Sequence, residues 1–154
     1  MFPLIGVTYF AATSIPLVFF DLKERRLPNK ITVPGLVVVV LSLAASANWP
    51  KFGISLLVGF AVFLVGLLLS IRGWIGMGDV KLYTSLGMLL AWFDPLLVWQ
   101  ATFWAFASAG VFVVVGYLAK KMTARSTLAL GPYLLFGFWV AVTPATISAL
   151  DVAL

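Results

Sequence analysis

The chain has 154 residues, of which 63% are hydrophobic and 10% are charged, with a net charge of +5, whereas a soluble domain carries about 45–50% apolar and about 25% charged residues. This excess of apolar residues predicts a single integral membrane domain over residues 1–154, because a chain of this length cannot bury so much apolar surface in its own core. The lack of histidine and cysteine excludes a Ser-His-Asp triad, a thiol nucleophile and zinc sites of the Cys/His type.

Six apolar segments follow one another along the chain, and a helix needs about 20 such residues to cross a bilayer. They cover residues 3–20, 31–47, 52–71, 80–93, 96–119 and 128–149. Pro34 is expected in the first turn of the second segment, and Asp94 and Pro95 are expected to be the N-cap and first-turn proline of the fifth. The fourth segment is too short to span alone unless the preceding glycine-rich loop extends it. The pattern predicts an all-α polytopic membrane protein with about six transmembrane helices.

Basic residues gather in alternate loops of this arrangement. The first, third and fifth loops hold Lys23, Arg25, Arg26, Lys30, Arg72, Lys81, Lys120, Lys121 and Arg125. Only Lys51 falls on the other side. Because cytoplasmic loops are rich in lysine and arginine, we expect these loops at the cytoplasmic face of the cell (inner) membrane and both termini outside. The positive charge therefore indicates topology and contact with anionic membrane lipid, and not nucleic-acid binding.

The first apolar segment is expected to remain as a helix. No basic residue precedes it and its charges come after it, which is unlike a cleavable signal peptide. Gly59 and Gly66, both in the third segment, are candidates for close helix contacts because small residues let helix backbones approach.

The acidic residues are few and can be sorted by position: Asp21, Glu24, Asp79, Asp94 and Asp151. A cap and a solvated tail account for Asp94 and Asp151, which fall on the outer side. Asp21 and Asp79 fall at the cytoplasmic ends of apolar segments, where an ionisable group is costly and tends to face a polar cavity or a partner.

Structural and catalytic interpretations of Asp21 and Asp79 are both open at this point. Asp21 can pair with Arg25 one helical turn later, and Asp79 can cap the fourth helix. In favour of catalysis, Gly76 and Gly78 allow another backbone to approach closely, and the two acids lie at the same membrane depth. Two carboxyls in a partly dry site share one proton, so that one can take a proton from water while the other donates to a scissile carbonyl. This is the chemistry of an aspartyl protease, which needs no metal or cofactor.

Three stretches of the chain carry a family resemblance: "FFDLKERRLPNKIT" at 19–32, "GMGDVKL" at 76–82 and "LGPYLLFG" at 130–137. In this order they resemble the type IV prepilin peptidases and the related archaeal preflagellin peptidases, which are polytopic aspartyl proteases of the GxGD type. The resemblance implies that Asp21 and Asp79 are the catalytic pair. It implies a prepilin-like precursor as the substrate, with a basic cytoplasmic leader and an adjacent apolar helix, cut at its leader peptide at the cytoplasmic membrane face. Further residues match family positions and are expected to shape or support the site: Gly76, Gly78, Lys81, Arg26, Asn29, Gly131 and Pro132.

The chain departs from the larger bacterial members of that family in one respect. Those members carry an additional cytoplasmic segment with paired CxxC motifs, and they also methylate the mature pilin. This chain has no cysteine and looks like the short members associated with tight-adherence pili, so peptidase activity alone is expected.

Two alternatives remain. A proton-coupled small membrane transporter would use Asp21, Asp79 and Lys81 along a path, although no internal repeat is evident and both acids lie at one face. A non-catalytic pilus assembly factor would keep the scaffold without the chemistry, although the presence of both aspartates argues against it.

Overall fold

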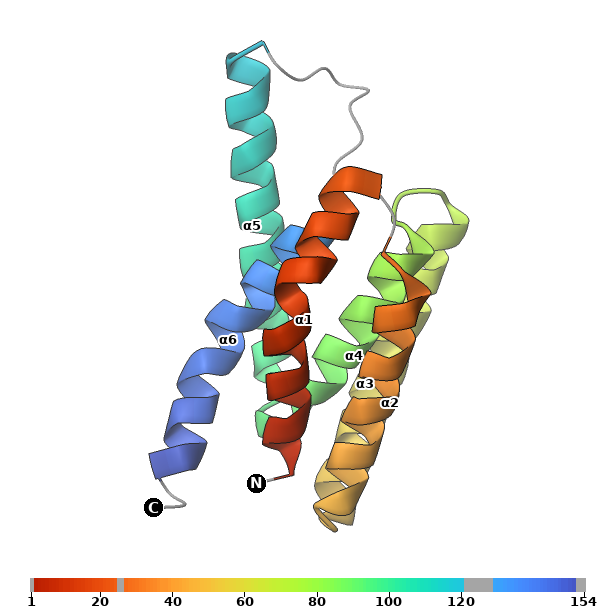
Figure 1. The fold of residues 1–154 in the computed structure, drawn as a ribbon, viewed down its shortest axis with the longest axis vertical. Helices are drawn as coiled ribbons and strands as arrows, with labels where there is room; N and C mark the ends of the chain where they lie inside the picture. The colour runs from red at the N-terminus through yellow and green to blue at the C-terminus, as the bar shows by residue number, and fades with distance from the viewer. Residues whose placement is uncertain (1, 25–26, 121–128, 152–154) are drawn as a thin grey trace.

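The computed structural model describes residues 2–24, 27–120 and 129–151, which form six helices and contain no strand (Figure 1). The helices are α1 (Pro3–Glu24), α2 (Asn29–Ala45), α3 (Trp49–Ile71), α4 (Met77–Phe93), α5 (Leu96–Leu118) and α6 (Gly131–Asp151). Every predicted apolar segment corresponds to one helix, so the all-α prediction is confirmed. Arg25 and Arg26 lie outside the described residues.

Three of the helices are long and apolar enough to cross a membrane, judged by length and composition. They are α1, α3 and α5, while α2 is a shorter apolar helix of 17 residues. The helices run alternately up and down, so that α1 starts and α6 ends at the same end of the bundle (Figure 1). Such an arrangement of long apolar helices is that of a membrane protein.

The start of α2 differs from the prediction. Pro28 occupies the N-cap, and its carbonyl accepts hydrogen bonds from the amides of Ile31 at 3.0 Å and Thr32 at 3.2 Å. The helix therefore includes the polar Asn29. Pro34 lies in the second turn of α2, whereas the prediction placed it in the first turn. The start of α5 also differs by one residue, because Pro95 and not Asp94 is its N-cap, although Oδ1 of Asp94 still accepts a hydrogen bond from the amide of Leu96 at 2.8 Å.

The predicted weak fourth segment is the centre of the bundle. Helix α4 contacts each of the other helices, and most of its residues from Val80 to Trp92 are buried. It begins at Met77, so the end of the glycine-rich loop extends it to 17 residues, a length of about 26 Å. Its apolar side chains are covered mainly by protein, which explains why the segment is shorter than a lipid-exposed span.

Glycines set the distance between α3 and α4. A Cβ atom on Gly59 would lie 2.1 Å from Cγ of Met88, and one on Gly66 would lie 2.8 Å from Cγ1 of Val80. Side chains larger than hydrogen would therefore push the helices apart. The predicted close contacts at Gly59 and Gly66 are confirmed, and they fix α3 beside the helix that carries Asp79.

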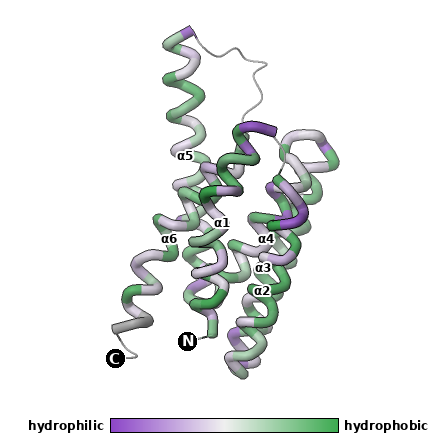
Figure 2. The backbone as a smooth tube through the Cα atoms, in the orientation of Figure 1, coloured by the Kyte–Doolittle hydropathy of each residue, from purple (hydrophilic) through white to green (hydrophobic). Residues whose placement is uncertain are grey.

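Polar residues collect at the ends of the bundle, as Figure 2 shows. The end of α1, the start of α2 and the last turns of α3 and α5 lie at one end (Figure 1). The described basic residues at this end are Lys23, Lys30, Arg72, Lys81 and Lys120, whereas Lys51 starts α3 at the opposite end. The helix arrangement thus keeps the asymmetry of charge that the sequence predicted.

Candidate active site

Asp21 is held by the first residue of the last helix. It lies in the final turn of α1 with only 3% of its surface exposed, and its Oδ2 accepts a hydrogen bond from the amide of Gly131 at 2.9 Å. The first amides of a helix have no partner within the helix and carry partial positive charge. A carboxylate at this position satisfies such an amide, and the hydrogen bond favours its ionised form against the cost of burial. The expected alternative partner, Arg25, lies outside the described residues.

The start of α6 is shaped to accept this carboxylate. A Cβ atom on Gly131 would lie 2.7 Å from Oδ2 of Asp21, a distance that real side chains do not tolerate. Pro132 follows in the first turn, where a residue without an amide proton costs no hydrogen bond. The next two amides, of Tyr133 and Leu134, bond to the carbonyl of Leu130. The "LGPY" sequence therefore directs one free amide at Asp21.

Asp79 lies in the first turn of α4 and is not its N-cap. The N-cap is Gly76, with an extended backbone (φ −70°, ψ 143°), so the expected capping position of Asp79 is wrong by three residues. The side chain instead turns back toward Gly76, where a Cβ atom would lie 3.1 Å from Oδ2 of Asp79. Its other oxygen, Oδ1, is buried and has no hydrogen-bond partner within the part of the chain that the structure describes.

Burial and the charge of Asp21 together change the pKa of Asp79. Asp79 directly precedes the apolar segment 80–93 and lies outside α1, α3 and α5, the three helices long enough to cross a membrane. Burial, and then the negative charge of Asp21, raise the pKa of Asp79 to about 7, although the backbone of Gly76 opposes the change by hydrogen bonding. A carboxyl with this pKa holds a proton about half of the time at pH 7. The charge of Asp21 thus acts on Asp79 although the two residues are 58 positions apart in the sequence.

The glycine between Met77 and Asp79 joins the first loop to α4. A Cβ atom on Gly78 would lie 2.9 Å from Cβ of Leu27 and 3.4 Å from its backbone nitrogen and oxygen. Any larger residue would separate the loop from the helix. Gly78 therefore keeps the end of α1, which carries Asp21, next to the start of α4.

Two further predicted residues meet at the exposed rim. Nζ of Lys81 donates a hydrogen bond to Oδ1 of Asn29 at 3.1 Å, which links the first turn of α2 to the start of α4. This contact supports the position of α4 and does not involve the carboxyls directly. Arg26, the remaining predicted support residue, lies outside the described residues.

Comparison with known proteins identifies the family to which the chain belongs. The model of the type IV leader peptidase family matches residues 8–118, a range that includes Asp21 and Asp79. The chain belongs to the type IV leader peptidase family. The family resemblance inferred from the sequence motifs is thereby confirmed, and with it a peptidase that acts on a protein substrate. No curated protein and no solved structure matches the chain.

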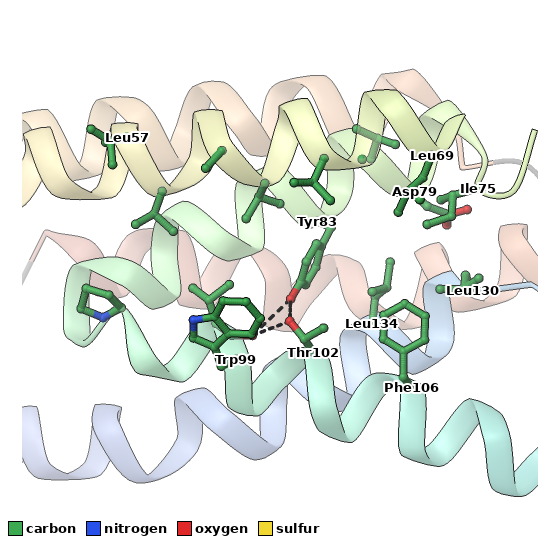
Figure 3. Close-up of a pocket in the computed structure, with 18 residues that line it drawn as sticks. Leu57, Leu69, Ile75, Asp79, Tyr83, Trp99, Thr102, Phe106, Leu130 and Leu134 are labelled. Carbon is green, nitrogen blue, oxygen red and sulfur yellow. Dashed lines mark hydrogen bonds between the residues drawn. The ribbon is translucent and has the colours of Figure 1, made fainter. Parts of the chain in front are cut away.

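This leader peptidase also has an apolar groove that the sequence did not predict. A cavity of about 400 Å³ lies between α3 and α5 with α4 as its floor, and Asp79 is one of its lining residues (Figure 3). Its walls are otherwise almost entirely apolar, apart from the hydroxyls of Tyr83 and Thr102, which hydrogen-bond to each other. Because α3 and α5 are apolar around their whole circumference, no periodic pattern marks the sides that face the groove.

No three histidine, cysteine or acidic side chains among residues 2–24, 27–120 and 129–148 lie close enough together to hold a metal ion. The groups that the site offers for chemistry are the two carboxyls, the Gly131 amide and the apolar surface beside them.

Proposed function

We propose that the chain is a membrane aspartyl endopeptidase of the GxGD type, with Asp21 and Asp79 as its catalytic pair. It cleaves the leader peptide of type IV pilin-like precursors at the cytoplasmic membrane face. The observation that carries the proposal is the pair itself. One buried carboxylate is fixed by a helix N-terminus, and the pKa of the second carboxyl is raised to about 7 by its own burial and then by the charge of the first. Family membership supports the choice of a leader peptide as the substrate.

The two carboxyls differ in a way that assigns their roles. Asp21 accepts the Gly131 amide, which favours its ionised form, whereas Asp79 retains a proton near neutral pH. Asp21 therefore takes a proton from water as the water oxygen attacks the scissile carbonyl carbon. Asp79 gives its proton to the carbonyl oxygen, and a tetrahedral diol results.

The second half of the reaction reverses these transfers. Asp21 passes its proton to the amide nitrogen of the diol, the carbon–nitrogen bond breaks, and Asp79 regains a proton from the diol hydroxyl as the new carboxyl group forms. Both residues return to their starting states. The reaction consumes one water molecule and uses no metal or cofactor, and no methyl transfer is expected.

The charge distribution supports the placement in the membrane. Asp21 and Asp79 lie at the end of the bundle that carries Lys23, Lys30 and Lys81, and basic ends of membrane bundles face the cytoplasm. We therefore place the protein in the cell inner membrane as a multi-pass protein with both termini outside. A leader peptide on the cytoplasmic side would reach the pair without crossing the bilayer.

The test is cleavage of a pilin precursor by the purified protein, followed as a shorter product on a gel. Asp21→Asn and Asp79→Asn should each reduce cleavage by about a thousandfold or more, because each removes one of the proton transfers. Asp94→Asn is the matched control, since Asp94 is exposed and asparagine also caps helices. Near-full activity of either dyad variant would refute the mechanism. No cleavage by the unaltered protein would favour the transporter or the assembly factor.

A further inference from the structure

The groove between α3 and α5 leads directly to Asp79 of the candidate catalytic pair. Asp79 lines it where α4 begins, and Pro95, which follows the end of α4, lines it at the far end. The groove therefore runs along the whole of α4, which has 17 residues and a length of about 26 Å. No Cα atom of α3 lies within 8 Å of a Cα atom of α5 over the residues described, so the two backbones stand apart on either side of the groove.

The walls of the groove select an apolar occupant. Leu57 and Val65 from α3 and Trp99 from α5 line it, and they are 71%, 58% and 75% exposed. The hydroxyls of Tyr83 and Thr102 lie within hydrogen-bonding distance of each other and of the carbonyl of Val98, so their two protons already have acceptors within the bundle. Polar capacity is left at one end, where Oδ1 of Asp79 has no partner in the described part of the chain.

An occupant that fits these walls is apolar along about 26 Å and polar at one end only. We propose that the groove binds the apolar helix of the substrate, lying along α4, with the scissile peptide bond at Asp79. This inference rests on the proposed peptidase function. A backbone within a helix has its amides and carbonyls paired, so a helix suits a groove that offers no free hydrogen-bonding groups, while the unpaired backbone at its end suits the carboxyl.

The arrangement predicts a register between the two helices. Leu69 lies toward the Asp79 end of the groove, and Leu57 lies toward the other end (Figure 3). Val65 lies about one turn before Leu69 in α3. Val65 and Leu57 are eight positions apart (65 − 57 = 8), which is about 12 Å along a helix. A substrate residue near Leu57 should therefore lie about eight residues farther from the scissile bond than one near Val65.

Disulfide crosslinking tests this register, since the chain has no cysteine of its own. Single cysteines are placed at Leu57 and Val65, and at the lipid-facing controls Leu64 and Leu68, which are exposed but do not line the groove. The Asp21→Asn background keeps the substrate intact. The substrate is a pilin precursor with single cysteines along its apolar helix. A disulfide forms only when the two Cα atoms come within about 7 Å.

We expect crosslinks from Leu57 and Val65 to substrate positions about eight residues apart, and few from Leu64 or Leu68. Crosslinks from the controls Leu64 and Leu68 would overturn the inference. A lack of crosslinks from all four positions, while the unaltered protein still cleaves, would also overturn it. In the second case the groove would hold lipid. A third outcome separates the two proposals. If crosslinks form in the predicted register but cleavage persists in the Asp21→Asn and Asp79→Asn variants, the catalytic pair is refuted and the groove remains a binding site for the substrate.

Kinetics give a second measurement. Val65→Trp fills the groove, whereas Leu64→Trp adds the same ring on the neighbouring, lipid-facing position. We expect KM for the precursor to rise about tenfold or more in the first variant with kcat largely kept, because only substrate binding is obstructed. The second variant should stay within about twofold of the unaltered protein. Equal values of KM in the two variants would overturn the inference.

Discussion

The contact between α6 and Asp21 offers the sharpest test of the site. Replacing Gly131 with alanine would place a Cβ atom 2.7 Å from Oδ2 of Asp21, a distance that forces the carboxylate or the helix to move. The movement breaks the hydrogen bond from the Gly131 amide to Oδ2, which now spans 2.9 Å. A hydrogen bond to a charged group contributes about 1.5–3 kcal/mol.

Loss of this hydrogen bond destabilises the ionised form of Asp21, which takes a proton from water in the proposed mechanism. We therefore expect kcat/KM to fall about tenfold to about 150-fold, since 1.4 kcal/mol corresponds to a factor of ten. The assay is cleavage of a pilin precursor over a range of substrate concentrations. Gly110→Ala is the matched control, because a Cβ atom there meets nothing within 4 Å. Equal kcat/KM for Gly131→Ala and Gly110→Ala would show that the contact does not position the catalytic carboxylate.

Two further predictions concern pH and the rim of the site. Because the pKa of Asp79 is raised to about 7, cleavage should fall as the pH rises through that value and the acid loses its proton. A constant rate from about pH 6 to about pH 9 would contradict this assignment. The hydrogen bond between Lys81 and Asn29 is exposed, so Lys81→Met and Asn29→Ala should each lower kcat/KM by about tenfold at most. The double variant should be no worse than the worse single variant, and fully additive losses would show that the two residues act separately.

The stability of the protein should change with pH for the same reason. The folded-state pKa of Asp79 lies above its ordinary value of 3.8, so its contribution to the free energy of unfolding is fully present below about pH 4 and is lost as the pH rises through about 7. Acid therefore favours the folded form through this group, which is opposite to the usual effect of a salt-bridged carboxylate.

The helices were largely predictable because each one is a long apolar run bounded by polar residues, and such a run has few other folds available in a membrane. The errors fell at helix starts. Backbone hydrogen bonds to Pro28 draw the polar Asn29 into α2, and Gly76 takes the N-cap position expected for Asp79. Both depend on the conformation of a single turn, which residue type alone does not fix.

The sequence by itself determined that this is an all-helical membrane protein, and it limited the possible catalytic acids to five residues. The three motifs also identified the family. Only the tertiary structure decided that Asp21 is held by the amide of Gly131, 110 residues away, and that α3 and α5 stand apart to leave a groove that reaches Asp79. There are two physical reasons. Side chains that face lipid and side chains that face the groove are equally apolar, so the sequence does not distinguish them. The first amide of a helix has no partner within the helix, and the sequence does not show which carboxylate will accept its hydrogen bond.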